Sequence, residues 1–458
     1  MNYMYFYYES AFNILRQRYY KKGRDTILAI DGFLIIGILL FLVLTKKTSI
    51  HFALVVVPIA VALLTGFGPG ELSGFMETGL SNIAQTGIMI TFAILFFGIM
   101  FDAGLFDPII KGVIKIAGGD PVKITIGTAI IAMVSHLDGS GSSTFLITVS
   151  SMLPIYKSLG MSPLTLAVTA ALSAGTMNMV PWGGSTLRAA SVLNVNVMDL
   201  FTPMLPVLAV GLLWVLACSY WLGKQERKKL GIIHELPEEV REREMKQPEG
   251  SDLKRPNLFY VNILLTLLVL TCLITEFFPL AVTFIIAVPL ALLINYRDLD
   301  IQQRLIENHA KGAIYTASII FSAGIFTGIL QETGMIEAMA DSMVGLVPNS
   351  WGGALPVILA FIAMPLSLLF DPDSFYFGVL PVLSEVGENF GIEPVTMGRA
   401  AIIGQMTTGF PVSPLTGSTW LLVGLAGVHI GDLQKKAIPL AFGTSVVMAI
   451  MALMIGVI

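Results

Sequence analysis

The sequence contains few charged residues. Of its 458 residues only 13% are Asp, Glu, Lys or Arg, against roughly 25% in a typical soluble domain, and 55% are hydrophobic. This composition excludes a soluble globular chain and predicts an all-α polytopic protein of the lipid bilayer. The formal net charge of −4 is too small to indicate a nucleic-acid partner.

Cysteines and catalytic motifs are also scarce. Cys218 and Cys272 are the two cysteines, and both lie in apolar runs without the spacing of a disulfide framework or a metal site. No nucleotide-binding motif, nucleophile–base pair or metal-ligand spacing is present. We therefore expect no enzyme, no resident cofactor and no ATP-driven step.

The apolar segments divide the chain into two transmembrane halves, over 27–223 and 257–458. An aromatic and basic leader, 1–26, precedes them, and it is either an interfacial segment or a plain extension. The highly charged stretch 224–256 is rich in Lys and Arg, which predicts a cytoplasmic linker. Lengths of 17 to 25 residues per span give about 11–12 spans. Candidate spans lie near 27–45, 50–68, 85–103, 121–137 and 204–223. The pair 262–276 and 279–295 is interrupted by Glu276 and Pro279, so either both members cross or only one does.

The second half repeats the first in order, which indicates duplication of one unit. Four pairs of segments match: 98–105 with 324–335, 138–143 with 371–374, 161–168 with 392–399, and 179–187 with 409–420. Each unit is expected to hold a re-entrant hairpin followed by a broken transmembrane helix. Lys157 lies beside the first hairpin and glutamates lie beside the second, so the repeats are predicted to be inverted, with the first hairpin cytoplasmic.

Polar breaks interrupt the apolar runs at 138–144 and 176–188, and again in the second half. Irregular backbone inside a bilayer is tolerated only where it is buried in protein or lines a cavity. We expect the hairpin tips 138–144 and 371–375 to approach each other near mid-membrane; the alternative is surface turns between short helices. The substrate-binding residues predicted from the breaks are Ser142, Ser143, Thr144, Asn178, Gly183, Gly184, Ser185, Thr186, Arg188, Ser374, Ser413, Thr416, Ser418 and Thr419.

Charged residues at membrane depth point to function. Arg188 is the only Lys or Arg in the breaks, and its planar fork suits a carboxylate; alternatively it forms a structural ion pair. Asp138, Asp371 and Asp373 are candidates for carrying the coupling proton or cation. Capping of a helix start is the alternative for Asp371 and Asp373. His136 is expected to be satisfied in the packing and outside the site.

Four segments carry a family resemblance: 137–156 (LDGSGSSTFLITVSSMLPIY), 177–191 (MNMVPWGGSTLRAAS), 371–385 (DPDSFYFGVLPVLSE) and 413–427 (SPLTGSTWLLVGLAG). The sequence resembles the metal-citrate:proton symporters of the ion-transporter superfamily. The resemblance implies uptake of citrate complexed with a divalent cation such as Mg²⁺ or Ca²⁺, driven by protons. It also implies a homodimer with an elevator-like transport domain in a bacterial cell membrane. Ser140 stands where the family commonly has an acid. The resemblance therefore does not decide which metal accompanies citrate, or whether one is needed.

Other functions remain as alternatives. The nearest is a proton- or sodium-coupled transporter of a di- or tricarboxylate, or another organic anion, without metal. A channel or an ion/proton antiporter without an organic substrate is a different class, but it has no evident use for the guanidinium of Arg188.

Overall fold

The computed structural model describes residues 23–43, 45, 47–231, 253–345 and 347–458, and these are helical with no β-strand among them. The interpretations of residues 1–22 and 232–252 lie outside the described residues. The first half contains a helix at Gly23–Val43, then α2 (Ile50–Leu64), α3 (Pro69–Asp102), α4 (Asp107–Ala117), α5 (Pro121–Ser135), a 3₁₀ turn (His136–Asp138), α6 (Gly141–Ser158), α7 (Pro163–Met177), α8 (Gly184–Leu193), α9 (Val197–Phe201), a second 3₁₀ turn (Thr202–Met204) and α10 (Leu205–Leu230).

The second half follows the same plan. It contains a 3₁₀ turn (Pro256–Leu258), α12 (Phe259–Ile274), α13 (Leu280–Asn295), α14 (Leu299–Glu332), α15 (Met335–Val344), α16 (Asn349–Gly352), α17 (Leu355–Leu366), a π-helical turn (Ser374–Val379), α18 (Leu380–Glu388), α19 (Pro394–Ile402), two further turns (Gly404–Thr408 and Phe410–Val412), α20 (Gly417–Ala426) and α21 (Ile430–Met454). Helix α10 continues through 224–230, into the range assigned to the linker.

The helices begin where the local sequence favours a start. Pro69, Pro121, Pro163 and Pro394 each stand in the first turn of a helix, where the missing N–H has no intrahelical partner. The carboxylate of Asp120 accepts the backbone N–H of Val122 at 3.0 Å and so caps α5. Local signals therefore set these starts before any tertiary contact is made.

The two halves are structural repeats. Helices α3 and α14 are 34 residues long each, and each leads into a shorter helix, a hairpin and a broken helix. The corresponding pairs are α3 and α14, α4 and α15, α5 and α17, α6 and α18, α7 and α19, α8 and α20, and α10 and α21. The predicted duplication of a unit with a hairpin and a broken helix is thus confirmed.

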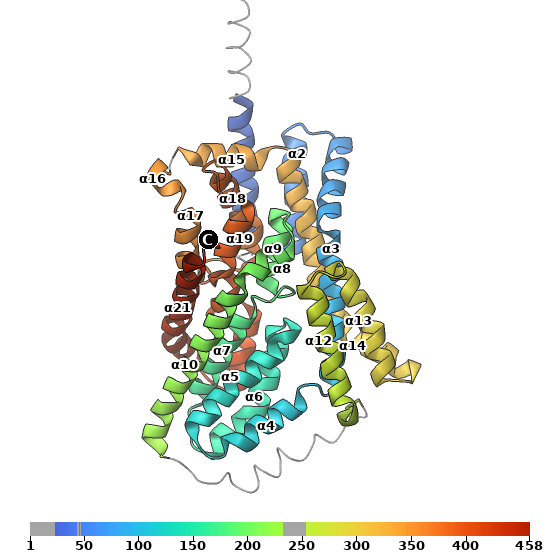
Figure 1. Cartoon of the computed structure of the whole chain (residues 1–458). Helices are drawn as coiled ribbons and strands as arrows, with labels where there is room; N and C mark the ends of the chain where they lie inside the picture. The colour runs from blue at the N-terminus through green and yellow to red at the C-terminus, as the bar shows by residue number, and fades with distance from the viewer. Residues whose placement is uncertain (1–22, 44, 46, 232–252, 346) are drawn as a thin grey trace, which may run out of the picture.

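The repeats are inverted because α3 and α14 pack antiparallel. A Cβ added at Gly79, early in α3, would lie 2.0 Å from the carbonyl oxygen of Gly324, late in α14. At Gly98, late in α3, it would lie 2.5 Å from His309, early in α14. In Figure 1, α3 runs down toward α4 at the lower end of the molecule, whereas α14 leads into α15 at the upper end. The two hairpins therefore enter from opposite ends.

Among the described residues, six helices are long and apolar enough to cross a membrane. The remaining apolar helices, 10–17 residues each, are mostly the arms of hairpins and the halves of broken helices, which explains why the predicted count of about 11–12 spans is larger. The span expected near 85–103 belongs to α3, which begins much earlier, at Pro69. The sequence did not predict this start because polar residues between Ser81 and Thr86 interrupt the apolar run. In the structure these polar residues line a water-accessible pocket rather than face lipid.

Each hairpin packs against the broken helix of the other repeat. Helix α6 of the first hairpin lies along α20, and the π-helical turn and α18 of the second hairpin lie along α8. A Cβ at Gly141, at the start of α6, would lie 3.2 Å from the side chain of Ser418. These contacts between the two repeats place the polar breaks of both repeats in the interior of one helical body.

Candidate functional site

The break between α7 and α8 is folded around Asn178. The side-chain oxygen of Asn178 lies 3.2 Å from Nε2 of His136 and accepts the backbone N–H of Gly184 at 3.4 Å. Its amide nitrogen donates to the carbonyl oxygen of Met406, in the break of the second repeat, at 2.5 Å. A Cβ at Gly183 would lie 2.1 Å from the carbonyl oxygen of Asn178, so only glycine fits there. Asn178 therefore holds the two broken helices together.

The first hairpin tip is a self-capped turn. Asp138 accepts the backbone N–H of Ser140 at 2.8 Å, and Gly139 has a φ of 72°, a left-handed conformation that glycine adopts readily. Ser140 accepts the backbone N–H of Ser143 at 3.3 Å and its hydroxyl at 3.1 Å, which caps α6. The N-terminus of α6 and the carboxylate of Asp138 are thereby held at one place.

Arg188 joins the first broken helix to the tip of the second hairpin. Its Nε donates to Oδ1 of Asp373 at 2.6 Å, and its Nη1 donates to the carbonyl oxygen of Gly184 at 3.2 Å. Asp371 accepts the hydroxyl of Ser374 and the backbone N–H of Asp373. Arg188 thus forms an ion pair, the alternative considered from the sequence, and Asp371 takes the capping position considered for it.

A central cavity of about 530 Å³ lies beside this constellation. Four of the predicted site residues line it, namely Asp138, Ser143, Gly184 and Arg188, together with Gly139, Ser140, Trp182 and Met406. Since Arg188 also contacts Asp373, both hairpin tips approach this point. The starts of α6 and α8 face the cavity, and the positive ends of helices favour an anion there.

The other predicted site residues are not part of the cavity wall in the described structure. Several are occupied by hydrogen bonds inside the breaks: Ser185 donates to the carbonyl oxygen of Asn178 at 2.8 Å, and Thr186 donates to that of Met179 at 2.8 Å. Thr419 donates to the carbonyl oxygen of Phe410 at 2.8 Å. The predicted residues outside the wall are Ser142, Thr144, Asn178, Gly183, Ser185, Thr186, Ser374, Ser413, Thr416, Ser418, Thr419, Asp371 and Asp373.

His136 is completely buried and packs as expected from the sequence. Its Nδ1 lies 2.8 Å from the hydroxyl of Thr144, and its Nε2 faces Asn178. The ring stacks on Phe410 with 6.0 Å between ring centroids. Histidine here connects the first hairpin tip to both breaks.

The opposite wall of the cavity was missed by the sequence interpretation. It comes from the long-helix pair, α3 and α14, through Asp102, Asn308, His309, Tyr315 and Thr316, with apolar side chains between them. The one signal available was Asp102, a carboxylate at the end of a strongly apolar stretch of α3, since His309 lies among the polar and charged residues of the first turns of α14. The charged and titratable side chains of the whole cavity are therefore Asp102, Asp138, Arg188, His309 and Tyr315.

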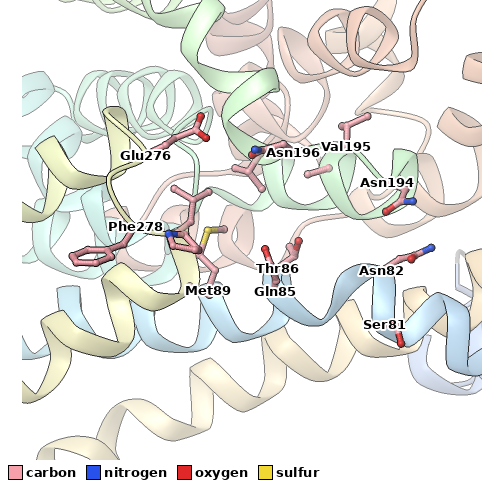
Figure 2. Close-up of a pocket in the computed structure, with 15 residues that line it drawn as sticks. Ser81, Asn82, Gln85, Thr86, Met89, Asn194, Val195, Asn196, Glu276 and Phe278 are labelled. Atoms are coloured by element: carbon pink, nitrogen blue, oxygen red, sulfur yellow. The ribbon is translucent and has the colours of Figure 1, made fainter.

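A second pocket, of about 590 Å³, lies higher along α3 and is called here the α3 pocket. Figure 2 shows it between α3, the link after α8 and the turn between α12 and α13, with Gln85, Thr86, Asn194, Asn196 and Glu276 among its labelled side chains. Met89 lines the α3 pocket and the next residue, Ile90, lines the central cavity. The two cavities thus follow one another along α3.

The sequence matches the family described as citrate transporter (CitMHS) over residues 39–404. A Bacillus subtilis (strain 168) protein named "Citrate transporter" is 46% identical over 432 residues, covering 94% of this chain and 100% of that relative. A second protein of that organism, "Mg(2+)/citrate complex secondary transporter", is 45% identical over 432 residues, covering 94% and 99%.

Among solved structures, the Alcanivorax borkumensis YdaH transporter, described as having an unusual topology, is similar with a TM-score of 0.60. The match covers 84% of this chain and 88% of that one at 13% sequence identity, so the likeness concerns the fold alone. Both the family match and the two relatives span most of this sequence, and they agree with the resemblance carried by its four motifs. The chain is a multi-pass membrane protein and belongs to the citrate transporter family.

Proposed function

We propose that this protein is a secondary transporter that takes up citrate as a complex with a divalent cation, together with protons. The observation that carries the proposal is the full-length similarity, at 45% identity, to the relative named a Mg(2+)/citrate complex secondary transporter. The composition of the central cavity supports it. One guanidinium, Arg188, lies there with the carboxyl groups of Asp138 and Asp102.

The charge balance of the cavity favours a metal complex over free citrate. A citrate trianion would meet two carboxyl groups and a guanidinium that is already paired with Asp373. A divalent cation held by citrate cancels most of the substrate charge, so one guanidinium and two helix N-termini are sufficient for the remainder. Within the described residues no three His, Cys, Asp or Glu side chains gather to hold a metal, so citrate itself would supply the ligands.

In this proposal Arg188, Ser143 and the start of α8 at Gly184 bind substrate carboxylates. Asp138 carries the coupling proton: it is protonated while the loaded site moves inward, since a lone carboxylate in a bilayer is disfavoured, and it releases the proton on the cytoplasmic side. The deeper residues of the breaks, including Thr144, Asn178, Ser374 and Ser413, keep the two tips in register around the substrate. The homodimer and the elevator-like movement stay predictions of the family resemblance.

Uptake of radiolabelled citrate into proteoliposomes tests the substrate. We expect uptake with Mg²⁺ or another divalent cation present, and little uptake when EDTA removes it. Uptake that is equally fast in EDTA would contradict the metal complex and favour transport of a free di- or tricarboxylate. Driving uptake with an imposed proton gradient or an imposed sodium gradient, at constant membrane potential, separates the two coupling ions.

A further inference from the structure

A carboxylate–histidine pair faces the central cavity from the long-helix pair. Nε2 of His309, in α14, lies 2.8 Å from Oδ2 of Asp102, at the end of α3. Because a carboxylate only accepts hydrogen bonds, Nε2 carries a proton in this pair, and Nδ1 of the neutral ring is left as a proton acceptor. Within the described residues Nδ1 has no hydrogen-bond partner.

The backbone is shaped to hold this ring. Gly98 lies beneath His309 on α3, and a Cβ at this position would stand 2.5 Å from Nδ1 and 2.7 Å from two ring carbons. Any side chain larger than hydrogen would displace the imidazole. The ring therefore packs against Gly98 and is held at Nε2 by Asp102, and the side chains of His309 and Asp102 are each 23% exposed.

The charged groups around the pair come from different elements. Across the cavity stand Asp138, from the first hairpin tip, and Arg188, from α8. Behind the pair stand Arg255, whose backbone N–H donates to the carbonyl oxygen of Ala103 at 2.9 Å, and Tyr296, whose ring lies 4.7 Å from the Arg255 guanidinium. The remaining wall from α3 and α14 combines the apolar Ile90, Ile94, Phe101 and Ile319 with the polar Asn308, Tyr315 and Thr316.

We assign the end of the cavity that contains this pair to the cytoplasmic side of the membrane. Asp102 is the last residue of α3, at the end where α4 lies and where α10 finishes with Arg227, Lys228 and Lys229. Basic residues at the end of a span indicate the cytoplasmic face. His309 therefore lines the cavity beside the end that we assign to the cytoplasm, and Asp138 lines the same cavity from the first hairpin tip.

We propose that His309, positioned by Asp102, accepts the coupling proton from Asp138 and delivers it to the cytoplasm. This inference rests on the proposed proton symport. The carboxyl O–H of Asp138 breaks as its proton moves through water in the cavity to Nδ1, which gives a carboxylate and an imidazolium paired with Asp102. The imidazolium then loses that proton to cytoplasmic water, and the neutral ring is restored.

The arrangement makes proton release depend on conformation. His309 and Asp102 belong to the long-helix pair, whereas Asp138 belongs to the hairpin that packs on the broken helices. A movement of the hairpin relative to α3 and α14 would separate donor from acceptor. The proton then leaves only in the state in which the cavity contains both groups.

The test compares two transport modes of His309→Gln in proteoliposomes, using radiolabelled citrate with Mg²⁺ and pyranine inside the vesicles to report proton entry. Gln retains an N–H for Asp102 but does not titrate. We expect net uptake driven by a proton gradient, and the accompanying proton entry, to fall roughly a hundredfold or more, the range that a positioned acid–base group contributes. Exchange between citrate-loaded vesicles and external citrate at equal pH should stay near the wild-type rate, because the carrier then need not release its proton.

His51→Gln is the matched control, since His51 also contacts α14, through the hydroxyl of Ser318 at 2.8 Å, and lies outside the cavity. It should leave both modes unchanged. Should His309→Gln fail to assemble, Gly98→Ala displaces the ring and should give the same selective loss, with Gly74→Ala, in open space on the same helix, as its control.

Equal losses of net uptake and exchange would make His309 structural and overturn the inference, as would unchanged proton entry in the variant. Wild-type protein that transports citrate without any proton entry would overturn the proposed coupling, and this inference with it. Selective loss of the proton-driven mode, with normal exchange, is the result that supports it.

Discussion

At the scale of single residues, Arg188 has the ion pair that the sequence offered as the alternative to a substrate-binding role, and the substrate-binding role stays a proposal. It is 7% exposed, forms an ion pair with Asp373 and still lines the central cavity. The pair reaches across the two repeats, so an incoming carboxylate competes with Asp373 or adds to its contact. In the proposed function, this guanidinium would transmit substrate binding directly to the second hairpin tip.

Replacing Arg188 with Lys should lower citrate uptake by about tenfold or more. Lys retains the positive charge but loses the planar fork that binds Asp373 through Nε, and a hydrogen bond to a charged group contributes about 1.5–3 kcal/mol. Uptake by proteoliposomes measures the change, and the amount of protein in the membrane should stay constant. Arg399→Lys, which changes a contact to the carbonyl oxygen of Asp199 outside the cavity, is the control. Normal uptake by Arg188→Lys would exclude a substrate-binding role.

Replacing Asp138 with Asn should remove the proton dependence of transport. The amide cannot titrate, yet its side-chain oxygen can still accept the backbone N–H of Ser140, so the hairpin tip should persist. Wild-type uptake should rise as the external pH is lowered, whereas the variant should respond little; the measurement is citrate uptake over a range of external pH. Asp107→Asn, in a pair with Lys254 away from the cavity, should keep the wild-type response. A wild-type pH response in Asp138→Asn would assign the proton to another group.

At the scale of elements, the crossing of α3 and α14 depends on glycine. Gly79 contacts Gly324 and Gly328 so closely that the two backbones touch. A Cβ added at Gly79 would lie 2.9 Å from the Cα of Gly328. Small residues at such a crossing let two membrane helices approach, and packing replaces the hydrophobic effect that is missing in lipid. This contact fixes the long-helix pair that carries one wall of the cavity.

The substitution Gly79→Leu should therefore lower the free energy of unfolding by about 1–3 kcal/mol or more, the range for overpacked sites. The added side chain has only backbone beside it, and backbone cannot rotate away. Thermal unfolding of the detergent-solubilised protein measures the effect. Gly74→Leu, on the same helix with no atom near an added Cβ, should unfold like the wild type. Equal unfolding temperatures for the two variants would contradict the crossing.

At the scale of the whole molecule, the two inverted repeats place one cavity after the other along α3. The central cavity uses Ile90 to Asp102 and the α3 pocket uses Ser81 to Met89, so α3 contributes to both. Beside the central cavity, Phe97 stacks on Trp182 with 4.9 Å between ring centroids, and Trp182 contacts Phe284 at 5.8 Å. We interpret the structure as an inward-facing state in which this aromatic cluster separates the two sides.

Single cysteines should report that state in a background with Cys218→Ser and Cys272→Ser. Thr316→Cys, in the central cavity, should react with a membrane-impermeant maleimide in inside-out vesicles and poorly in right-side-out vesicles. Asn82→Cys, in the α3 pocket, should show the opposite preference, and the cysteine-free background should not react. Labelling of both positions from the same side would exclude an inward-facing state.

Much of this architecture was predictable because it is encoded locally. Apolar runs, the ordered repeat, Pro at helix starts and Gly-rich breaks act over a few residues each, and they indicated an inverted-repeat transporter with Asp138 and Arg188 at its centre. The family resemblance, carried by four motifs, is confirmed by the full-length matches. Glycines and hydroxyls of the breaks were predicted as ligands, yet many of them, such as Ser185 and Thr186, satisfy backbone carbonyls, a demand that arises only once the helix is broken.

Only the tertiary structure decided which groups meet. Arg188 and Asp373 are 185 positions apart, and His309 and Asp102 are 207 apart, so no local pattern connects them. Their contacts follow from antiparallel packing of two long helices over glycines, and from the insertion of each hairpin against the other repeat's broken helix. The apolar composition determined that charged side chains at membrane depth must be paired or face water. The packing of the helices determined which partner each charged side chain has and which cavity it lines.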